Sequence, residues 1–244
     1  MKKTILFLMF LVSATSIAQD TVYEQTFVKA HNIGAYDFYI ENVFSKVHKQ
    51  RIDAGLIKEW NVWKVMDSPQ EDFTHMITTV YSVDKQDEIN AFDWERPEGV
   101  TQRDEWIRGK DLNEIREIIG VVKYTGLARA RKAGAKDVPD YMAYNVIKLK
   151  GDKWKSYETA EINGTKKIGK SDLRVGWDYG RRIDDYGTDI SHTHVTIDWY
   201  DSHADFLKTF MSNSPADASK EYQEMMKLRD LKYRVFMKKH KMTN

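Results

Sequence analysis

Two short stretches of the sequence carry the same pair of chemically useful side chains at the same spacing. HMITTVY (75–81) and HVTIDWY (194–200) each begin with a histidine and end with a tyrosine six residues later. Imidazole nitrogens can take up protons or bind metals, and tyrosine hydroxyls can hydrogen-bond a ligand. The side chains that could do such chemistry are His75 and Tyr81 in the first stretch, and His194, Asp198 and Tyr200 in the second.

Both stretches are typical of β-strands, and the alternation of side chains within a strand decides where these residues point. Residues at i, i+2 and i+4 share one face, so the polar side chains of 194–200 lie opposite Val195, Ile197 and Trp199. We expect the apolar face to pack on helices, which leaves the polar face to line a cavity between two sheets. The five residues above are therefore predicted to bind a ligand there. The alternative is a structural hydrogen-bond network in which they satisfy one another.

Aromatic residues mark the strand that precedes each of these stretches. Trp60 and Trp63 lie in the first such strand, and Trp177 and Tyr179 lie in the second. Core packing is the ordinary role of these side chains, but a tryptophan that faces a cavity can stack on a flat ligand. We predict Trp60 and Trp177 as walls of the ligand site.

The pair His192 and His194 raises the alternative of a metal site. Two histidines at i and i+2 of a strand face the same side and could hold Zn²⁺, Cu²⁺ or Fe²⁺ together with Asp189 or Asp198. No HExxH motif and no cysteine supports such a site, so we predict no bound metal. A haem would need an axial ligand, for which His75 and His194 are equal candidates, and the cofactor stays unassigned.

The elements that position these residues occur twice in the same order. Hydrophobic periodicity and alternation predict, in each copy, a strand, a helix and two further strands. The first copy comprises 21–29, 35–54, 57–66 and 74–83, and the second comprises 141–149, 154–169, 173–183 and 192–200. This order is most of a ferredoxin-like unit. We predict an α+β fold in which two ferredoxin-like repeats of one chain form a pseudo-dimeric α/β barrel.

Additional helices are predicted in the segments that remain. Leu112, Ile115, Ile119 and Val122 have helical spacing between the copies. A short helix is expected at 202–210, followed by a long C-terminal helix that opens at 214–215 and continues through Phe236. The predicted domain boundaries are 19–127 for the first repeat with its helical insertion, 128–140 for a linker and 141–244 for the second repeat.

The N-terminal residues have the order of a secretory signal peptide. Lys2 and Lys3 precede an apolar run, and small residues occupy the −3 and −1 positions of a cut after Ala18. We expect removal of residues 1–18 and a periplasmic or secreted mature chain. The sequence contains no cysteine, so such a chain would rely on its packed core rather than on disulfides.

Charge and hydropathy argue against two classes of partner. The 38 basic and 37 acidic residues nearly cancel, whereas nucleic-acid-binding proteins usually carry a basic excess. No apolar run after the N-terminal segment is long enough to cross a bilayer. We therefore expect a small-molecule ligand, no nucleic acid and no membrane span. The sequence leaves the oligomeric state undecided.

Three longer stretches carry a resemblance to a known family. VFSKVHKQRIDAGLIKEWNVWKV (43–65), KKIGKSDLRVGWDYGRR (166–182) and GTDISHTHVTIDWY (187–200) resemble the secreted dimeric α/β-barrel proteins common in Bacteroidetes. Val47 stands where that family usually has proline, and the second copy has no counterpart of His48. The wider superfamily includes antibiotic-biosynthesis-type monooxygenases, haem-degrading enzymes and chlorite-dismutase-like proteins, so the resemblance implies a fold rather than one reaction.

Three functions follow as hypotheses. The favoured one is an exported protein that binds a small, partly apolar molecule in the barrel. The second is an oxygenase-type enzyme, either cofactor-free or haem-dependent, in which a histidine acts as base or ligand. The third is an interaction module without a pocket.

Overall fold

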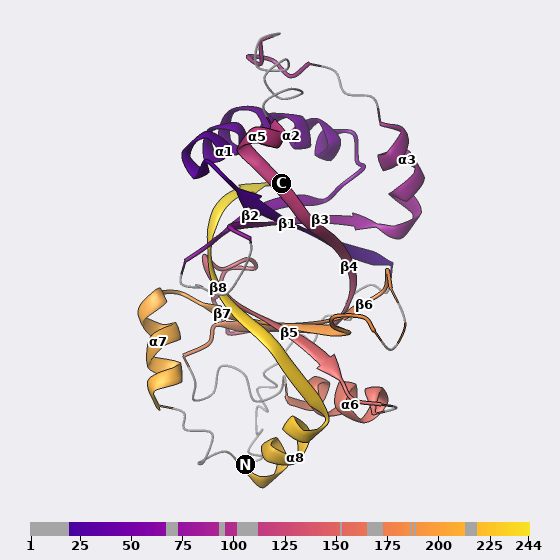
Figure 1. The fold of residues 1–244 in the computed structure, drawn as a ribbon, viewed down its shortest axis with the longest axis vertical. Helices are drawn as coiled ribbons and strands as arrows, with labels where there is room; N and C mark the ends of the chain where they lie inside the picture. Colours follow the sequence, from indigo (N-terminus) through magenta and orange to yellow (C-terminus); the bar gives the residue numbers. More distant parts are fainter. Residues whose placement is uncertain are drawn as a thin grey trace, which may run out of the picture.

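Segments rich in β-branched and aromatic residues form a closed barrel in the computed structural model (Figure 1). The expected signal peptide at 1–18 lies outside the residues that the structure describes. Those residues are 20–66, 73–92, 96–101, 112–151, 153–164, 173–185, 187, 189–212 and 219–244.

The barrel is built from strands that pair in an antiparallel manner with both neighbours. Their order around the barrel is β1-β3-β2-β8-β5-β7-β6-β4, and β4 pairs with β1 to close it. The strands are β1 (Thr21–Ala30), β2 (Glu59–Val65), β3 (His75–Ser82), β4 (Arg116–Arg131), β5 (Tyr141–Leu149), β6 (Gly176–Arg182), β7 (His194–Tyr200) and β8 (Arg229–Thr243).

The two halves of the barrel have the same topology. Strands β4-β1-β3-β2 form one sheet and β8-β5-β7-β6 form the other, so both follow the order fourth, first, third, second. This is the order of a ferredoxin-like unit. The α+β fold with two ferredoxin-like repeats is therefore confirmed.

The long fourth strand of each repeat joins the two sheets. Strand β4 pairs with β1 over most of its length and with β6 of the other repeat from Tyr124 onward. Strand β8 likewise pairs with both β5 and β2. Because each fourth strand is shared by both sheets, neither sheet has a free edge within the barrel.

Helices cover the outer face of each sheet. In the first repeat these are α1 (Ile33–Tyr39), the π-helical turn η1 (Ile40–Phe44) and α2 (Ser45–Asp53); in the second they are α6 (Trp154–Gly164), α7 (His203–Ser212) and α8 (Lys220–Lys227). Figure 1 shows α1 and α2 beyond the first sheet, and α6 and α8 beyond the second. The connection between β3 and β4 of the first repeat adds η2 (Val83–Lys85), α3 (Gln86–Ala91) and α5 (Leu112–Ile115).

Local signals explain the ends of the first helical segment. The side chain of Asn32 accepts a hydrogen bond from the backbone N–H of Ala35, which caps the N-terminus of α1. Gly55 follows α2 with a φ of 70°, a left-handed conformation that glycine adopts without strain. The helix predicted at 35–54 is confirmed as a helical segment that begins at Ile33 and ends at Asp53.

Two sequence-based predictions of secondary structure are wrong. Ile119 and Val122 lie in strand β4 rather than in a helix, and the long C-terminal helix ends at Lys227. Residues 229–243 form β8, because this stretch completes the second sheet and its Val235, Phe236 and Met237 are buried there. Strand β4 also continues to Arg131, so the sheet includes the beginning of the segment 128–140 that was assigned to a linker.

Candidate functional site

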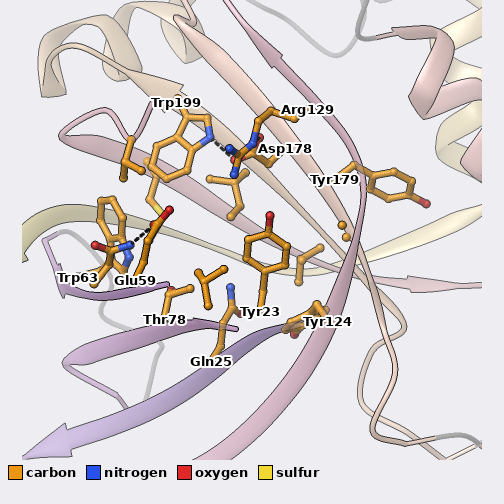
Figure 2. A pocket seen from close by; sticks show the side chains of 18 of the residues that line it. Tyr23, Gln25, Glu59, Trp63, Thr78, Tyr124, Arg129, Asp178, Tyr179 and Trp199 are labelled. Atoms are coloured by element: carbon orange, nitrogen blue, oxygen red, sulfur yellow. Dashed lines mark hydrogen bonds and ion pairs between the residues drawn. The ribbon is translucent and has the colours of Figure 1, made fainter. Parts of the chain in front are cut away.

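A cavity of about 80 Å³ lies inside the barrel and is lined by strands of both repeats. Its walls are mainly apolar: Met76 and Val80 come from β3, Met142 from β5, and Val195 and Ile197 from β7. The edges of the cavity carry a few polar side chains (Figure 2). An apolar hollow with a small number of polar groups is the usual composition of a small-molecule site.

The assignment of strand faces made from the sequence is reversed in the structure. Met76, Thr78 and Val80 of β3 line the cavity, whereas His75 lies on the outer face, where α1 packs. In β7, Val195, Ile197 and Trp199 line the cavity. The apolar face points inward because the interior of a small barrel is itself a packed core. None of the seven residues predicted as ligand contacts lines this cavity, and their role in binding stays a prediction.

His75 is fully buried between β3 and helix α1. Its Nε2 lies 3.0 Å from Oδ1 of Asp37, and its Nδ1 lies 2.9 Å from the hydroxyl of Thr74. Burial lowers the pKa of His75 to about 4, although Asp37 opposes the shift. The imidazole is therefore neutral at pH 7, with Nε2–H donating to the carboxylate.

His194 repeats this arrangement in the second half of the molecule. Its Nε2 lies 3.1 Å from Oε1 of Glu158 on α6, and its Nδ1 lies 2.9 Å from the hydroxyl of Thr193. Burial again lowers the pKa, to about 4, against the effect of Glu158. The two histidines are thus equivalent under the pseudo-symmetry, and their hydrogen bonds match the alternative of a structural network.

The other predicted polar contacts also have protein partners on the outer faces. Tyr81 donates to Oε1 of Gln86 over 2.7 Å. Asp198 accepts hydrogen bonds from Asn145 and Arg174, each over 2.9 Å. Tyr200 belongs to a buried aromatic cluster with Phe206 of α7, and burial raises the pKa of its hydroxyl.

Trp60 and Trp177 pack as core residues outside the cavity. Trp60 stacks on the ring of His48, with centroids 4.5 Å apart, and Trp177 stacks on Tyr179 at 5.6 Å. The cavity is instead bounded by Trp63 of β2 and Trp199 of β7. The indole rings of Trp63 and Trp199 lie 5.4 Å apart at an angle of 53°. Trp60 and Trp63 are three residues apart in a strand, so only one of them can face inward.

One end of the cavity holds a fully compensated carboxylate. Both oxygens of Asp178 accept hydrogen bonds from Arg131 over 2.8 Å, and Oδ2 also accepts one from the indole N–H of Trp199. The Nε atom of Arg129 lies 3.3 Å from the same carboxylate. Bidentate pairing of this kind fixes the geometry and neutralises the charge.

Two other polar groups of the cavity, the carboxylate of Glu59 and the hydroxyl of Tyr23, make fewer hydrogen bonds than Asp178 does. Oε2 of Glu59 accepts a hydrogen bond from Nδ2 of Asn61 over 3.0 Å, and Glu59 forms no salt bridge within the described residues. The hydroxyl of Tyr23 points into the cavity in Figure 2 and makes no hydrogen bond to the described part of the chain. Burial raises the pKa of Tyr23, and Arg129 opposes that rise.

A buried chain of hydrogen bonds leads from the cavity to the surface. Tyr144 donates to Oε1 of Gln25 and lies 3.1 Å from the hydroxyl of Tyr124. The hydroxyl of Tyr124 lies 2.6 Å from Nε2 of His192, whose Nδ1 lies 2.8 Å from the hydroxyl of the exposed Ser191. Gln25 and Tyr124 line the cavity, so this chain connects its interior with solvent.

The sequence suggested His192 only as a metal ligand and gave no sign of its contact with Tyr124, which lines the cavity. His192 precedes β7, and its ring turns toward Tyr124, whereas the ring of His194 turns toward Glu158. The two imidazoles therefore diverge instead of sharing a face as expected for an i, i+2 pair within one strand. Burial lowers the pKa of His192 to about 4, and the nearby Arg182 adds to the shift.

Haem, which the resemblance raised as a cofactor, does not fit the described residues. The cavity has about half the volume of the ~150 Å³ cavity that holds benzene, which is itself far smaller than a porphyrin. The two histidines proposed as axial ligands are fully buried on the outer faces and are hydrogen-bonded to Asp37 and Glu158.

No protein-family model and no curated protein matches this chain. Solved structures do match it. An anthrone oxidase-like protein superposes with a TM-score of 0.61 at 10% identity, covering 92% of each chain. A candidate monooxygenase from Fusobacterium nucleatum superposes with a TM-score of 0.57 at 12% identity, covering 92% of this chain and 93% of that one. A candidate monooxygenase from Lactobacillus acidophilus superposes with a TM-score of 0.54 at 12% identity, covering 92% of this chain and 96% of that one.

This chain has a dimeric α/β-barrel fold. The likeness extends over nearly the whole of the compared chains, and the two repeats supply what two subunits supply in a dimeric α/β barrel. At these identities the likeness concerns the fold, and the activity has to be argued from the site. Within the described residues, no helix is both long and apolar enough to span a membrane.

Proposed function

We propose that this dimeric α/β barrel binds a small, partly apolar molecule in the cavity between its sheets. The observation that carries the proposal is the mainly apolar cavity, bounded by Trp63 and Trp199, into which the hydroxyl of Tyr23 points without a described partner. Buried polar groups are normally hydrogen-bonded, so a ligand that pairs with this hydroxyl gains affinity. The aromatic walls would supply apolar contact.

The volume of the cavity limits the size of the ligand. A hollow of about 80 Å³ is about half as large as a dry cavity of about 150 Å³ that holds benzene, so a molecule with the volume of benzene or 1-butanol enters only with small movements of the wall side chains. We infer a ligand of about five non-hydrogen atoms. A ceiling of about 1.5 kcal/mol per atom then permits millimolar to micromolar affinity.

Indole N–H signals in an NMR titration would test this proposal. We expect 1-butanol to shift the signals of Trp63 and Trp199 saturably and to leave those of Trp60 and Trp177 in place, because only the first two face the cavity. Anthrone, a three-ring compound, should shift none of the four. Saturable shifts at Trp60 or Trp177 alone would place binding elsewhere and contradict the proposal.

An oxygenase-type enzyme without a cofactor is the second candidate, and the chain from Tyr124 to His192 favours it. A phenolic substrate that donates its proton to the Tyr124 hydroxyl could release it to solvent through His192, whose Nε2 lies 2.6 Å from that hydroxyl. Phenol is larger than the cavity and enters only if wall side chains move, and oxygen uptake with phenol as substrate would test this candidate. We expect turnover in the unaltered protein and its loss in Tyr124→Phe, with Tyr141→Phe as the control. The absence of uptake in the unaltered protein would eliminate this candidate.

We also propose that the protein acts outside the cytoplasm after removal of residues 1–18. The order of basic, apolar and small residues at the N-terminus supports this. Intact-mass analysis of the protein purified from the cell envelope or medium should give a chain that begins near Gln19. A mature chain that retains Met1 would contradict the proposal.

A further inference from the structure

The cavity contains two carboxylates, and only one of them has a cationic partner. Asp178 is held by Arg131 through two hydrogen bonds and approached by Arg129. Glu59, on β2, accepts one hydrogen bond from the neutral amide of Asn61 and has no salt bridge within the described residues. A half-buried carboxylate with no counter-ion costs free energy that a bound cation would recover.

Arg129 is the nearest candidate for a counter-ion of Glu59, but it is already engaged. Its Nε lies 3.3 Å from Asp178, and its Nη1 donates to Oδ1 of Asp137 over 3.2 Å. The electrostatic influence of Glu59 on Arg129 is smaller than that of either aspartate. Arg129 therefore leaves the carboxylate of Glu59 free to pair with a ligand.

The side chains around Glu59 favour a positive charge. Figure 2 shows its carboxyl group between the indoles of Trp63 and Trp199, with the hydroxyl of Tyr23 directed into the same space. Aromatic faces carry negative charge density and attract ammonium groups. The guanidinium carbon of Arg131 lies 5.3 Å from the ring centroid of Trp199, so Trp63 is the indole that remains for the charge of a ligand. The Tyr23 oxygen can accept a further hydrogen bond from an ammonium N–H.

We propose that the ligand of this cavity is a small alkylammonium, whose charged nitrogen binds Glu59 and whose alkyl chain lies against Trp63 and Trp199. This inference rests on the proposed function and specifies its ligand class. The ammonium donates to the Glu59 oxygen that Asn61 does not engage and to the hydroxyl of Tyr23. A chain of about four carbons fits the cavity after small movements of the wall side chains.

Three probes of similar size and different charge test the inference. The n-butylammonium ion, 1-butanol and butyrate are titrated separately, with the indole signals of Trp63 and Trp199 as the readout. We expect the ammonium to bind at least about tenfold more tightly than the alcohol, which corresponds to about 1.4 kcal/mol. Butyrate should produce no saturable shift.

The variant Glu59→Gln tests whether Glu59 causes the tighter binding of n-butylammonium than of 1-butanol. It keeps the size and hydrogen-bonding capacity of Glu59 but removes its charge, so the affinity for n-butylammonium should fall at least about tenfold, to that of 1-butanol. Glu88→Gln, on the exposed helix α3, is the matched control and should keep the full preference. Thermal unfolding of both variants checks that they fold.

Each failure has a distinct meaning. If none of the three probes shifts the two indole signals, the proposed function itself is wrong. If 1-butanol or butyrate binds as tightly as the ammonium, a cavity for small molecules stands but the cationic ligand class is overturned. If Glu59→Gln keeps the preference for the ammonium, Glu59 is not the recognising group and the inference is overturned as well.

Discussion

At the scale of single residues, the two histidines that open β3 and β7 connect sheets to helices. His75 links its strand to Asp37 of α1, and His194 links its strand to Glu158 of α6. In each repeat the preceding threonine satisfies the second ring nitrogen. Because every imidazole nitrogen has a protein partner, these residues hold the outer layers in place rather than offering free groups to a ligand.

The pKa values of these histidines predict how stability depends on pH. The folded-state pKa of His194 is about 4, below its ordinary value of 6.5, so the unfolded chain binds more protons between these values. The free energy of unfolding should therefore fall as the pH is lowered from 7 toward 5. The slope contributed by one such group is at most about 1.4 kcal/mol per pH unit.

Urea denaturation of His194→Gln at several pH values would measure this contribution. The slope should be shallower than in the unaltered protein, whereas His31→Gln, which removes an exposed histidine, should keep the original slope. Identical slopes in all three proteins would show that His194 is not held neutral in the folded state.

Tyr124 is predicted to be the most sensitive member of the buried chain inside the barrel. In Tyr124→Phe, Nε2 of His192 loses its partner, and the hydroxyl of Tyr144 keeps only Gln25. An unsatisfied buried polar group costs about 1–3 kcal/mol, so the free energy of unfolding should fall by about that amount. Tyr141→Phe, whose ring stacks on Phe236, should change it by less than about 0.5 kcal/mol. Equal effects would contradict the hydrogen-bond chain.

At the scale of secondary-structure elements, the fourth strand of each repeat determines whether the barrel closes. Sequence periodicity identified the first three strands of each copy and the first helix, because their apolar spacing is regular. Sequence periodicity failed for β8, because the helical spacing of Tyr222, Met225 and Leu228 continues at Leu231 and Val235. The sequence from Leu231 also carries apolar residues at every second position, Leu231, Tyr233, Val235 and Met237, which is the period of a strand.

Two alanine substitutions distinguish a strand from a helix at the C-terminus. In a helix, Leu231 and Val235 are four residues apart and share a face, so both substitutions would have similar costs. In β8 the register shift at Lys232 places Leu231 and Val235 on opposite faces of the strand. In β8, Val235 is fully buried and Leu231 is 38% exposed. Val235→Ala should therefore lower the free energy of unfolding by about 1–3 kcal/mol and Leu231→Ala by less than about 1 kcal/mol. Similar losses, measured by urea denaturation, would contradict the strand.

At the scale of the whole molecule, two repeats enclose one hollow. The duplication was predictable from the sequence, because both copies keep the order strand, helix, strand, strand. The inward face was not, since both faces of each sheet are buried, one by the barrel and one by helices. The outward-facing His75 and His194 hydrogen-bond to Asp37 and Glu158, respectively. No local sequence signal connects either carboxylate with its histidine. Polarity alone could not therefore identify the cavity.

The most direct test compares two neighbouring residues of β3 that point to opposite faces. Thr78 lines the cavity, and Ile77 packs on the helical side. Thr78→Phe should fill the hollow and abolish the saturable shifts of Trp63 and Trp199 on addition of n-butylammonium, whereas Ile77→Phe should leave them intact. Loss of the shifts in Ile77→Phe, together with their persistence in Thr78→Phe, would contradict a binding site inside the barrel.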